Sequence, residues 1–438
     1  MTTSTLIGYK AASDLASKLS FFAIVVIAAR LLTQEAFGLF SLAVTLGWIL
    51  SVAADFGLQL HVAREVARRP GDARAILAPL ARVRLGLTGI AAVAALPLSM
   101  AIGGRAALAF FAIVAAQILS SLVEFLNHLY RGLSRSDVES SLNLIQRLAT
   151  LVMAMCLLAW RPSLDVLAVA LVVPAAATLA LSARLARRLS APGRSTSPQG
   201  AESERGAARG DGAPASDALG GVQGTPPQRE KTLVRDVVPI GAGILLSALY
   251  FRIDLFLVQW WAGVEAVAVY NAAFRLVEAL RLFPAAVLAV VFPMLCRARS
   301  LKPLGFVAAG LLAFGLGLGA ITWALAPWIV RVFYGDAYAA AVPALRVLAL
   351  AVPFFFLNYA LTHQLVGWDA QARYARVSAA ALAANLLINA ALLPRLGVTG
   401  AAWATVLTEL VVTAGCVLGL ALAQSRRPAV RVTAVAVS

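Results

Sequence analysis

Long apolar stretches recur along the chain and are separated by short polar segments. Seven of them contain no Asp, Glu, Lys or Arg and meet or approach the roughly 20 residues that a helix needs to cross a bilayer. They are residues 36–54, 85–104, 106–123, 166–183, 303–330, 347–368 and 377–394. The runs are continuously apolar and rich in Ala and Leu, whereas the strands of a membrane barrel alternate in polarity. The pattern therefore predicts membrane-spanning α-helices.

Apolar stretches that contain single charges raise the predicted number of spans to about twelve, six in each half of the chain. The predicted spans are 6–29, 37–60, 79–101, 106–129, 139–160, 164–186, 234–261, 266–296, 304–330, 341–366, 374–394 and 398–424. The expected fold is an all-α integral membrane protein built from two six-helix lobes. The predicted domains are an N-terminal lobe (1–189), a cytoplasmic linker (190–232), a C-terminal lobe (233–425) and a cytoplasmic tail (426–438). We expect the linker to be flexible, because its Gly, Ser, Pro and Ala residues bury too little apolar surface to order it.

The two predicted lobes look like repeats of one another. A shift of 230 residues places residues 29–43 over 259–273 and pairs Glu35 with Glu265 and Phe40 with Tyr270. Six spans is an even number, so both halves begin on the same side of the membrane. The repeat is therefore parallel, with a pseudo-two-fold axis along the membrane normal, and two such lobes should enclose a cleft.

Composition and charge agree with a membrane protein and set its orientation. Hydrophobic residues make up 61% of the chain and charged residues 13%, which excludes an ordinary soluble domain. If the N-terminus is cytoplasmic, 26 Lys and Arg residues lie on that side and only five outside, so we expect both termini in the cytoplasm. The net charge of +16 is scattered over the loops, which argues against nucleic-acid binding. No cleavable signal peptide is evident, so we expect the first helix to be retained.

Ionisable side chains inside spans are candidate functional residues, since each costs about 2.5–3.5 kcal/mol on translocon scales. Lys10, Asp14 and Lys18 follow one another at i, i+4 and i+8, which places them on one face of the first helix. Two cations and one acid on a single face suit an anionic diphosphate. The alternative is structural: Lys10 reaches the interface and Asp14 pairs with Lys18.

The second half contains two further clusters of charged residues inside predicted helices. Arg252 and Asp254 lie on different faces of the seventh helix, so at least one should face protein or a cavity; an interhelical ion pair is the alternative. Arg275, Glu278 and Arg281 form a stripe at i, i+3 and i+6 on the eighth helix. We expect the Arg fork to contact a phosphate, with an internal salt-bridge ladder as the alternative.

Three further residues are candidates for ion coupling. Glu124 and His128 are four residues apart, and His titrates near neutral pH, so the pair could exchange a proton; an ordinary hydrogen bond is the alternative. Asp55 is the third, with capping of a helix end or pairing with nearby Arg as the alternative. The three Cys residues are far apart and predict packing rather than a disulfide or metal site. No ATP-binding loop occurs, and neither HExxH nor CxxC is present, so we expect no direct use of ATP, no metal and no cofactor.

Several stretches resemble a known family. They are ARLLTQEAFGLFSLA (29–43), ADFGLQLHVAREVAR (54–68), YFRIDLFLVQWWAGVEAVAVYNAAFRLVE (250–278), FPMLCRA (292–298), VFYGDAYAAAVPALRVLAL (332–350) and NLLINAALLPRLGVTGAAWATVLTEL (385–410). The chain is similar to the polysaccharide-exporting branch of the multidrug/oligosaccharidyl-lipid/polysaccharide superfamily, which includes the Wzx-type O-antigen flippases. Two features depart from relatives: the linker is long, and the related lipid II flippases resemble a fourteen-span plan.

The resemblance implies a V-shaped two-lobed bundle that alternates access to a central cavity. Its substrate would be undecaprenyl-diphosphate-linked oligosaccharide, an O-antigen or exopolysaccharide repeat unit, flipped to the periplasmic leaflet of the bacterial inner membrane. Expected partners are this substrate, membrane lipids and the polysaccharide polymerase or export machinery, and the default state is a monomer. The alternatives are a cation-coupled multidrug exporter, a membrane-embedded polysaccharide-biosynthesis enzyme and a scaffold. A drug exporter should have a dominant acidic site, whereas the charges inside these spans are mixed and rich in Arg.

Overall fold

The computed structural model describes residues 3–190, 226–298 and 300–425, and helices account for nearly all of them. The first half contains six long helices and the short helix α3, which lies between α2 and α4. Their bounds are α1 (Thr3–Leu31), α2 (Gln34–Asp55), α3 (Leu58–Arg68), α4 (Ala73–Ile102), α5 (Gly104–Gly132), α6 (Ser136–Trp160) and α7 (Leu164–Leu189).

The second half begins with a helix of 55 residues that is broken inside. The helices are α9 (Pro226–Leu280), α10 (Leu282–Arg297), α11 (Lys302–Tyr334), α12 (Ala341–Ala349), α13 (Val352–Gly367), α14 (Gln371–Leu396) and α15 (Val398–Gln424), with a 3-10 turn η2 (Asp336–Tyr338). Gly263 breaks α9, because its φ of 85° lies in the left-handed region that favours glycine. The break separates the predicted seventh and eighth spans.

The helices of the described residues confirm the predicted all-α fold with about twelve spans. Ten stretches are long and apolar enough to cross a membrane, and the bent pair α12 and α13 adds one more. The longest stretch, Gly241–Arg297, counts as two spans because Gly263 divides it. The second predicted span, 37–60, was too long: α2 ends at Asp55, and the positive φ values of Phe56 and Gly57 turn the chain into α3.

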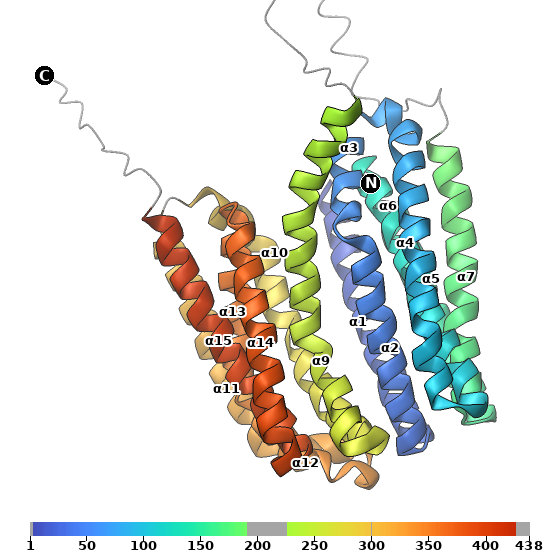
Figure 1. The fold of residues 1–438 in the computed structure, drawn as a ribbon, viewed down its shortest axis with the longest axis vertical. Helices are drawn as coiled ribbons and strands as arrows, with labels where there is room; N and C mark the ends of the chain where they lie inside the picture. Colours follow the sequence, from blue (N-terminus) through green and yellow to red (C-terminus); the bar gives the residue numbers. More distant parts are fainter. Residues whose placement is uncertain (1–2, 191–225, 299, 426–438) are drawn as a thin grey trace, which may run out of the picture.

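The domain boundaries stay predictions. Residues 191–225 of the predicted linker 190–232 and the predicted tail 426–438 lie outside the described residues. The helix α9 begins at Pro226, inside the predicted linker. Figure 1 shows that α1 and α9 begin, and α7 and α15 end, at the same end of the bundle, which we call the N-terminal end. This arrangement is what six spans in each half require.

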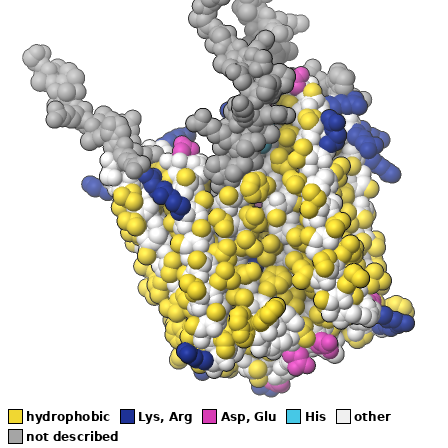
Figure 2. Space-filling view, viewed as in Figure 1, with side chains coloured by type: hydrophobic (Ala, Val, Ile, Leu, Met, Phe, Trp, Pro, Cys, Tyr) yellow, Lys and Arg dark blue, Asp and Glu magenta, His cyan; other side chains and the backbone are white. Residues whose placement is uncertain are grey.

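The flank of the bundle is apolar, as a surface facing lipid must be. Figure 2 shows hydrophobic side chains over most of this face, with Lys and Arg near its two ends. Large apolar side chains are strongly exposed among the described residues, for example Phe306 at 86% and Trp260 at 83%. Exposure of this extent suits a hydrocarbon solvent rather than water, so the chain is a multi-pass membrane protein.

The two halves meet along α2 and α9, which pack against each other. The amide of Asn271 donates a hydrogen bond of 2.8 Å to the hydroxyl of Ser41. These residues are 230 positions apart, which is the offset of the predicted repeat. Equivalent positions of two repeats touch one another only near the axis that relates them, so the axis of the predicted repeat would pass near the Ser41–Asn271 contact.

Further contacts hold the halves together at the end opposite the N-terminal end. The Arg30 guanidinium at the end of α1 donates to the backbone carbonyls of Val332 and Phe333, the latter at 2.8 Å. These carbonyls belong to the last turn of α11, where partners within the helix are missing and the helix dipole favours a cation. Gln34 donates to the carbonyl of Ala337 at 2.7 Å. We call these contacts the Arg30 clasp.

The close approach of α2 to α9 depends on Gly38. A Cβ atom at this position would lie 2.1 Å from the carbonyl oxygen of Val264. The substitution Gly38→Ala should therefore push the two helices apart and lower the free energy of unfolding by about 1–3 kcal/mol, as overpacking does. Thermal unfolding of the purified protein in detergent measures the effect. Gly86→Ala in α4 is the matched control, because nothing lies within 4 Å of its added atom; equal melting temperatures for both variants would contradict the packing argument.

Candidate functional site

A cluster of charged side chains lies where the two segments of α9 come together. The guanidinium of Arg252, before the break at Gly263, bonds to Glu278 Oε1 at 2.5 Å. Arg275, after the break, bonds to Glu278 Oε2 at 2.7 Å. One carboxylate therefore holds two arginines, one from each segment. Arg252 is only 4% exposed, so its pairing is made in a medium of low dielectric constant.

Aromatic rings complete the surroundings of these arginines. Arg252 lies over Phe251 and Phe274, at 5.1 and 4.9 Å from the ring centroids. Arg281, at the junction of α9 and α10, lies 4.2 Å from the centroid of Phe251. Arg281 forms no salt bridge with Glu278 among the described residues, because the helix breaks at Arg281. The alternative salt-bridge ladder therefore does not extend to this residue. Cation–π contacts of this kind stabilise a buried guanidinium without neutralising its charge.

The cluster extends to the N-terminal half through Phe21 on α1. The ring of Phe21 lies 5.4 Å from the guanidinium carbon of Arg275 and 5.6 Å from that of Arg147 on α6. We call Arg147, Arg252, Arg275, Arg281 and Glu278 the arginine cluster. Four guanidinium groups and one carboxylate leave it strongly positive. Two of its buried nitrogens, Arg252 Nη1 and Arg275 Nε, have no hydrogen-bond partner in the described parts of the chain.

Asp254 lies apart from the arginine cluster, although it is two residues from Arg252. Its carboxylate accepts hydrogen bonds from the hydroxyl of Tyr270 and from the backbone amide of Leu255. It lines a small cavity between α9, α14 and α15, together with Asn385, Thr405 and Glu409. The expectation that Arg252 and Asp254 point in different directions therefore fits the structure, in which Arg252 pairs with Glu278 and not with Asp254.

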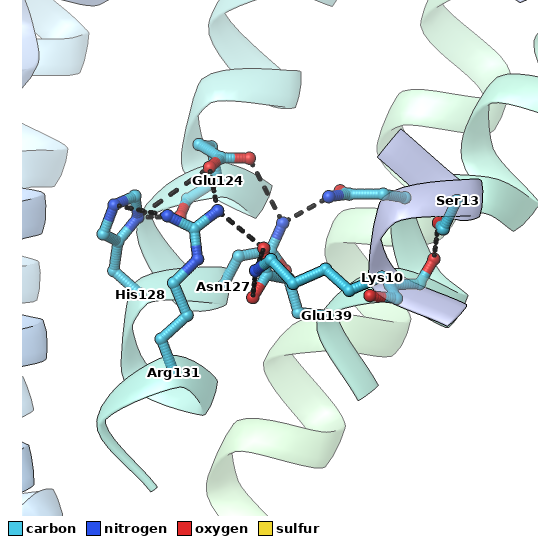
Figure 3. Close-up of polar contacts among 9 residues, drawn as sticks. Lys10, Ser13, Glu124, Asn127, His128, Arg131 and Glu139 are labelled. Atoms are coloured by element: carbon cyan, nitrogen blue, oxygen red, sulfur yellow. Dashed lines mark hydrogen bonds and ion pairs between the residues drawn. The ribbon is translucent and has the colours of Figure 1, made fainter. Parts of the chain in front are cut away.

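A second polar network holds the N-terminal half together (Figure 3). Glu139 on α6 is 1% exposed and pairs with Lys10 on α1 at 3.1 Å and with Arg131 on α5 at 2.6 Å. Arg131 also reaches Glu124 at 3.2 Å. Since Glu139 ties three helices to one another, its role is structural. Lys10 was predicted to bind substrate, but its ammonium group is paired with Glu139, which is 129 residues away in sequence.

The other two predicted charges of α1 have no such partner. Asp14 is half-buried and Lys18 is exposed. Lys18 lies within electrostatic reach of Asp14, but no salt bridge joins the two side chains in the residues that the structure describes. Both residues stay candidates for contact with a substrate.

The histidine of the predicted coupling pair is held by its neighbours. His128 Nδ1 lies 2.9 Å from the backbone carbonyl of Glu124, and Nε2 lies 3.2 Å from an Arg131 nitrogen. A carbonyl and a guanidinium at the two nitrogens favour a neutral ring with the proton on Nδ1. The carboxylate of Glu124 is farther away, at 3.9 Å from Nδ1. This geometry supports the structural alternative for Glu124 and His128 rather than proton exchange.

Asp55 lies at the turn from α2 to α3. Its Oδ2 accepts a hydrogen bond of 3.2 Å from the backbone amide of Gly57, as a side chain that caps a helix end does. Arg84 lies within electrostatic reach and is fully buried, with hydrogen bonds to the carbonyl of Ser51 and the hydroxyl of Ser121. The capping alternative for Asp55 therefore fits the structure better than ion coupling.

Sequence reasoning did not place Phe21, Arg147, Glu139 or Arg84 in a site. Arg147 and Arg84 carried a usable signal, since a charge inside an apolar span is costly. No such signal was present for Glu139, because this residue stood at a predicted helix end, where acidic residues are common. Phe21 resembles any lipid-facing aromatic residue until its distance to two arginines is known.

Comparisons with known proteins agree with this architecture. The sequence profile of the family described as "Polysaccharide biosynthesis protein" matches residues 7–299. The chain therefore belongs to this family. No curated protein sequence gave a significant match.

Several solved structures share the fold. Lipid II flippase MurJ in an inward closed conformation has a TM-score of 0.67 at 10% identity, and the alignment covers 94% of this chain and 87% of that one. An inward-facing multidrug resistance transporter of the MATE family, in the MOP superfamily, has a TM-score of 0.68 at 15% identity, covering 94% of each chain. A MOP superfamily transporter from Pyrococcus furiosus has a TM-score of 0.60 at 15% identity, covering 96% and 95%. At these identities the structures show that the chain shares their helical fold.

The dependence of the arginine cluster on Glu278 can be measured. The substitution Glu278→Gln leaves Arg252 and Arg275 without their shared counter-charge, so unfolding should become easier by about 3–5 kcal/mol. Glu265→Gln is the matched control, because Glu265 is exposed and lies beyond the break on the same helix. Thermal unfolding in detergent distinguishes the two variants. If Glu278→Gln melts at the temperature of the control, water already solvates the arginines and the ion pairs are not needed for stability.

Proposed function

We propose that this protein is a flippase that moves undecaprenyl-diphosphate-linked oligosaccharide across the bacterial inner membrane. The substrate is the repeat unit of an O-antigen or exopolysaccharide, and it passes from the cytoplasmic to the periplasmic leaflet. Membership of a polysaccharide biosynthesis family and a fold shared with a lipid II flippase support the proposal. The observation that carries it is the positive arginine cluster at the boundary of the two halves.

The chemistry of the cluster suits a diphosphate. Arginine presents a planar fork of donors that binds phosphate oxygens in pairs and stays charged in a medium of low dielectric constant. Glu278 pairs with Arg252 and Arg275 only, and two buried guanidinium nitrogens have no partner among the described residues. A dianionic diphosphate would offset the surplus charge and accept these hydrogen bonds. Lys18 and Asp14, on the same helix as Phe21, extend the polar surface along α1.

Transport by alternating access needs one end of the bundle to open while the other closes. The Arg30 clasp joins the halves at the end opposite the N-terminal end. In the proposed orientation the termini are cytoplasmic, so the clasp closes the periplasmic side. The lobes 1–189 and 233–425 would then move against one another, joined by the linker 190–232. We propose that a single chain suffices and that the polymerase or export machinery takes the product.

The second candidate is an exporter of cationic small molecules, as in multidrug transporters of this fold. Asp254 and Glu409 favour it, because two buried carboxylates line one cavity. Neither forms a salt bridge in the described residues; Glu409 accepts a hydrogen bond of 2.7 Å from Asn358 instead. That cavity lies within the second half, however, whereas the boundary between the halves carries the arginine cluster, which would repel a cation.

Deletion of the gene in its native host, followed by complementation, tests the proposal. Loss of the protein should remove surface polysaccharide and cause complete lipid-linked units to accumulate on the cytoplasmic face. Arg275→Ala should fail to restore export at normal protein abundance, since a lost charge-assisted hydrogen bond of about 1.5–3 kcal/mol weakens binding roughly tenfold to a hundredfold. Extraction and quantification of the lipid-linked intermediates, beside surface polysaccharide, provide the readout.

Arg64→Ala is the matched control, because Arg64 is exposed on α3 and lies outside the arginine cluster. Full export by Arg275→Ala would remove the cluster from the site. Unchanged surface polysaccharide and lipid intermediates after deletion, together with increased sensitivity to cationic compounds, would favour the second candidate.

A further inference from the structure

One face of α13 carries polar and aromatic side chains that are not fully buried. Tyr359, Thr362 and His363 are half-buried, whereas the residues that alternate with them around the helix, among them Asn358 and Leu361, are buried. Lipid-facing positions elsewhere on the bundle carry apolar side chains. A tyrosine, a threonine and a histidine on one face therefore suit a polar space inside the protein better than hydrocarbon.

This face lies close to the arginine cluster. Tyr359 and His363 are both within electrostatic reach of Arg281. Arg281 also lies 5.4 Å from the ring centroid of Phe355, one turn before Tyr359 on α13. Phe355, Tyr359 and His363 thus form a row at i, i+4 and i+8, which covers about 12 Å along the helix. The row starts at Arg281 and runs toward the N-terminal end of the bundle.

The rings of the row are held in fixed positions. Tyr359 and His363 are stacked, with centroids 4.4 Å apart and an interplanar angle of 23°. His363 Nδ1 lies 2.7 Å from the backbone carbonyl of Tyr359, so this nitrogen carries the proton that donates to it. Phe292 of α10 supports the imidazole edge-on at 5.8 Å. Because stacking covers the facing sides of the two rings, the pair offers its outer ring faces and ring edges in fixed positions, and it loses little conformational freedom when it binds a ligand.

Polar atoms at the edge of this surface are available to a ligand. In the part of the chain that the structure describes, neither the Tyr359 hydroxyl nor His363 Nε2 has a hydrogen-bond partner. The hydroxyl can donate and accept, and Nε2 of the neutral ring can accept. A flat apolar surface with hydrogen-bonding groups at its edge matches a pyranose ring, which has an apolar C–H face and a rim of hydroxyl groups.

We infer that Tyr359 and His363 form a saccharide-binding surface for the sugars next to the diphosphate of the lipid-linked substrate. The inference rests on the proposed function and adds to it a place for the glycan. The diphosphate occupies the arginine cluster, and the first sugars extend from Arg281 along α13. A prenyl chain alone would gain nothing from the hydroxyl and imidazole groups, so the surface should select for the sugar.

The experiment compares two substrates in vesicles that contain the purified protein. One is undecaprenyl diphosphate carrying the complete repeat unit, and the other is undecaprenyl diphosphate without sugar. Tyr359→Ala and Tyr359→Leu should slow the transfer of the complete unit by roughly three- to tenfold, the size expected for loss of one aromatic contact. Transfer of the sugar-free lipid should stay unchanged, and Tyr359→Phe should keep most of the rate because it keeps the ring.

Trp328→Ala is the control variant, since Trp328 is 61% exposed on the flank of α11. Equal slowing of both substrates by Tyr359→Leu would assign Tyr359 to helix packing and overturn the inference. Unchanged transfer of the complete unit would overturn it as well, while leaving the proposed function in place. A wild-type protein that transfers neither substrate would instead remove the proposed function, and the saccharide surface with it.

Discussion

The ion pairs of Glu278 with Arg252 and Arg275 are the interaction on which the second half of the molecule depends. A guanidinium inside a bilayer needs a counter-charge or a polar space, because hydrocarbon solvates neither. Glu278 provides that counter-charge to both segments of α9 at once. The pairing therefore holds the segments together on either side of the break at Gly263. The same carboxylate leaves the surrounding arginines in excess of negative charge, and this excess is the basis of the proposed diphosphate site.

Besides the packing of α2 against α9, two further kinds of contact join the halves, and they lie at different places. Near the arginine cluster, the ring of Phe21 connects Arg147 of the first half with Arg275 of the second. At the end opposite the N-terminal end, Arg30 binds the last carbonyls of α11, with no carboxylate involved. A clasp made of hydrogen bonds to backbone atoms leaves no buried charge unpaired when it opens, because water at the membrane surface can replace the carbonyls. Such a contact suits a structure that has to separate and close again.

The spans could be predicted from the sequence because the requirement for about twenty apolar residues is local. The break at Gly263 also fell between two predicted spans. The ends of α2 were not predicted correctly, because the turn at Phe56 and Gly57 lies inside an apolar stretch that reads as one helix. The parallel repeat was predicted from a weak match. Ser41 and Asn271, which are separated by the offset of that predicted repeat, are in contact in the structure.

The site was predicted less completely than the fold. The Arg275–Glu278 salt bridge is part of the ladder that the sequence offered as the structural alternative, and it forms because side chains three residues apart on a helix are neighbours. Arg252 reaches the same carboxylate across a hairpin of two helical segments, and Lys10 reaches Glu139 across more than a hundred residues. Spacing along the chain carries no information about such partners. Only the packing of α1 against α6, and of α9 against itself, decides which charges are satisfied and which stay available.

The central claim is that the arginine cluster binds the diphosphate of a lipid-linked saccharide. The most direct measurement is an experimental structure of the purified protein with undecaprenyl-diphosphate-linked oligosaccharide bound. The diphosphate should lie between the two halves, with its oxygens in hydrogen-bond contact with the guanidinium groups of Arg275 and at least one other arginine of the cluster. A diphosphate bound elsewhere, with the arginine cluster empty, would contradict the account.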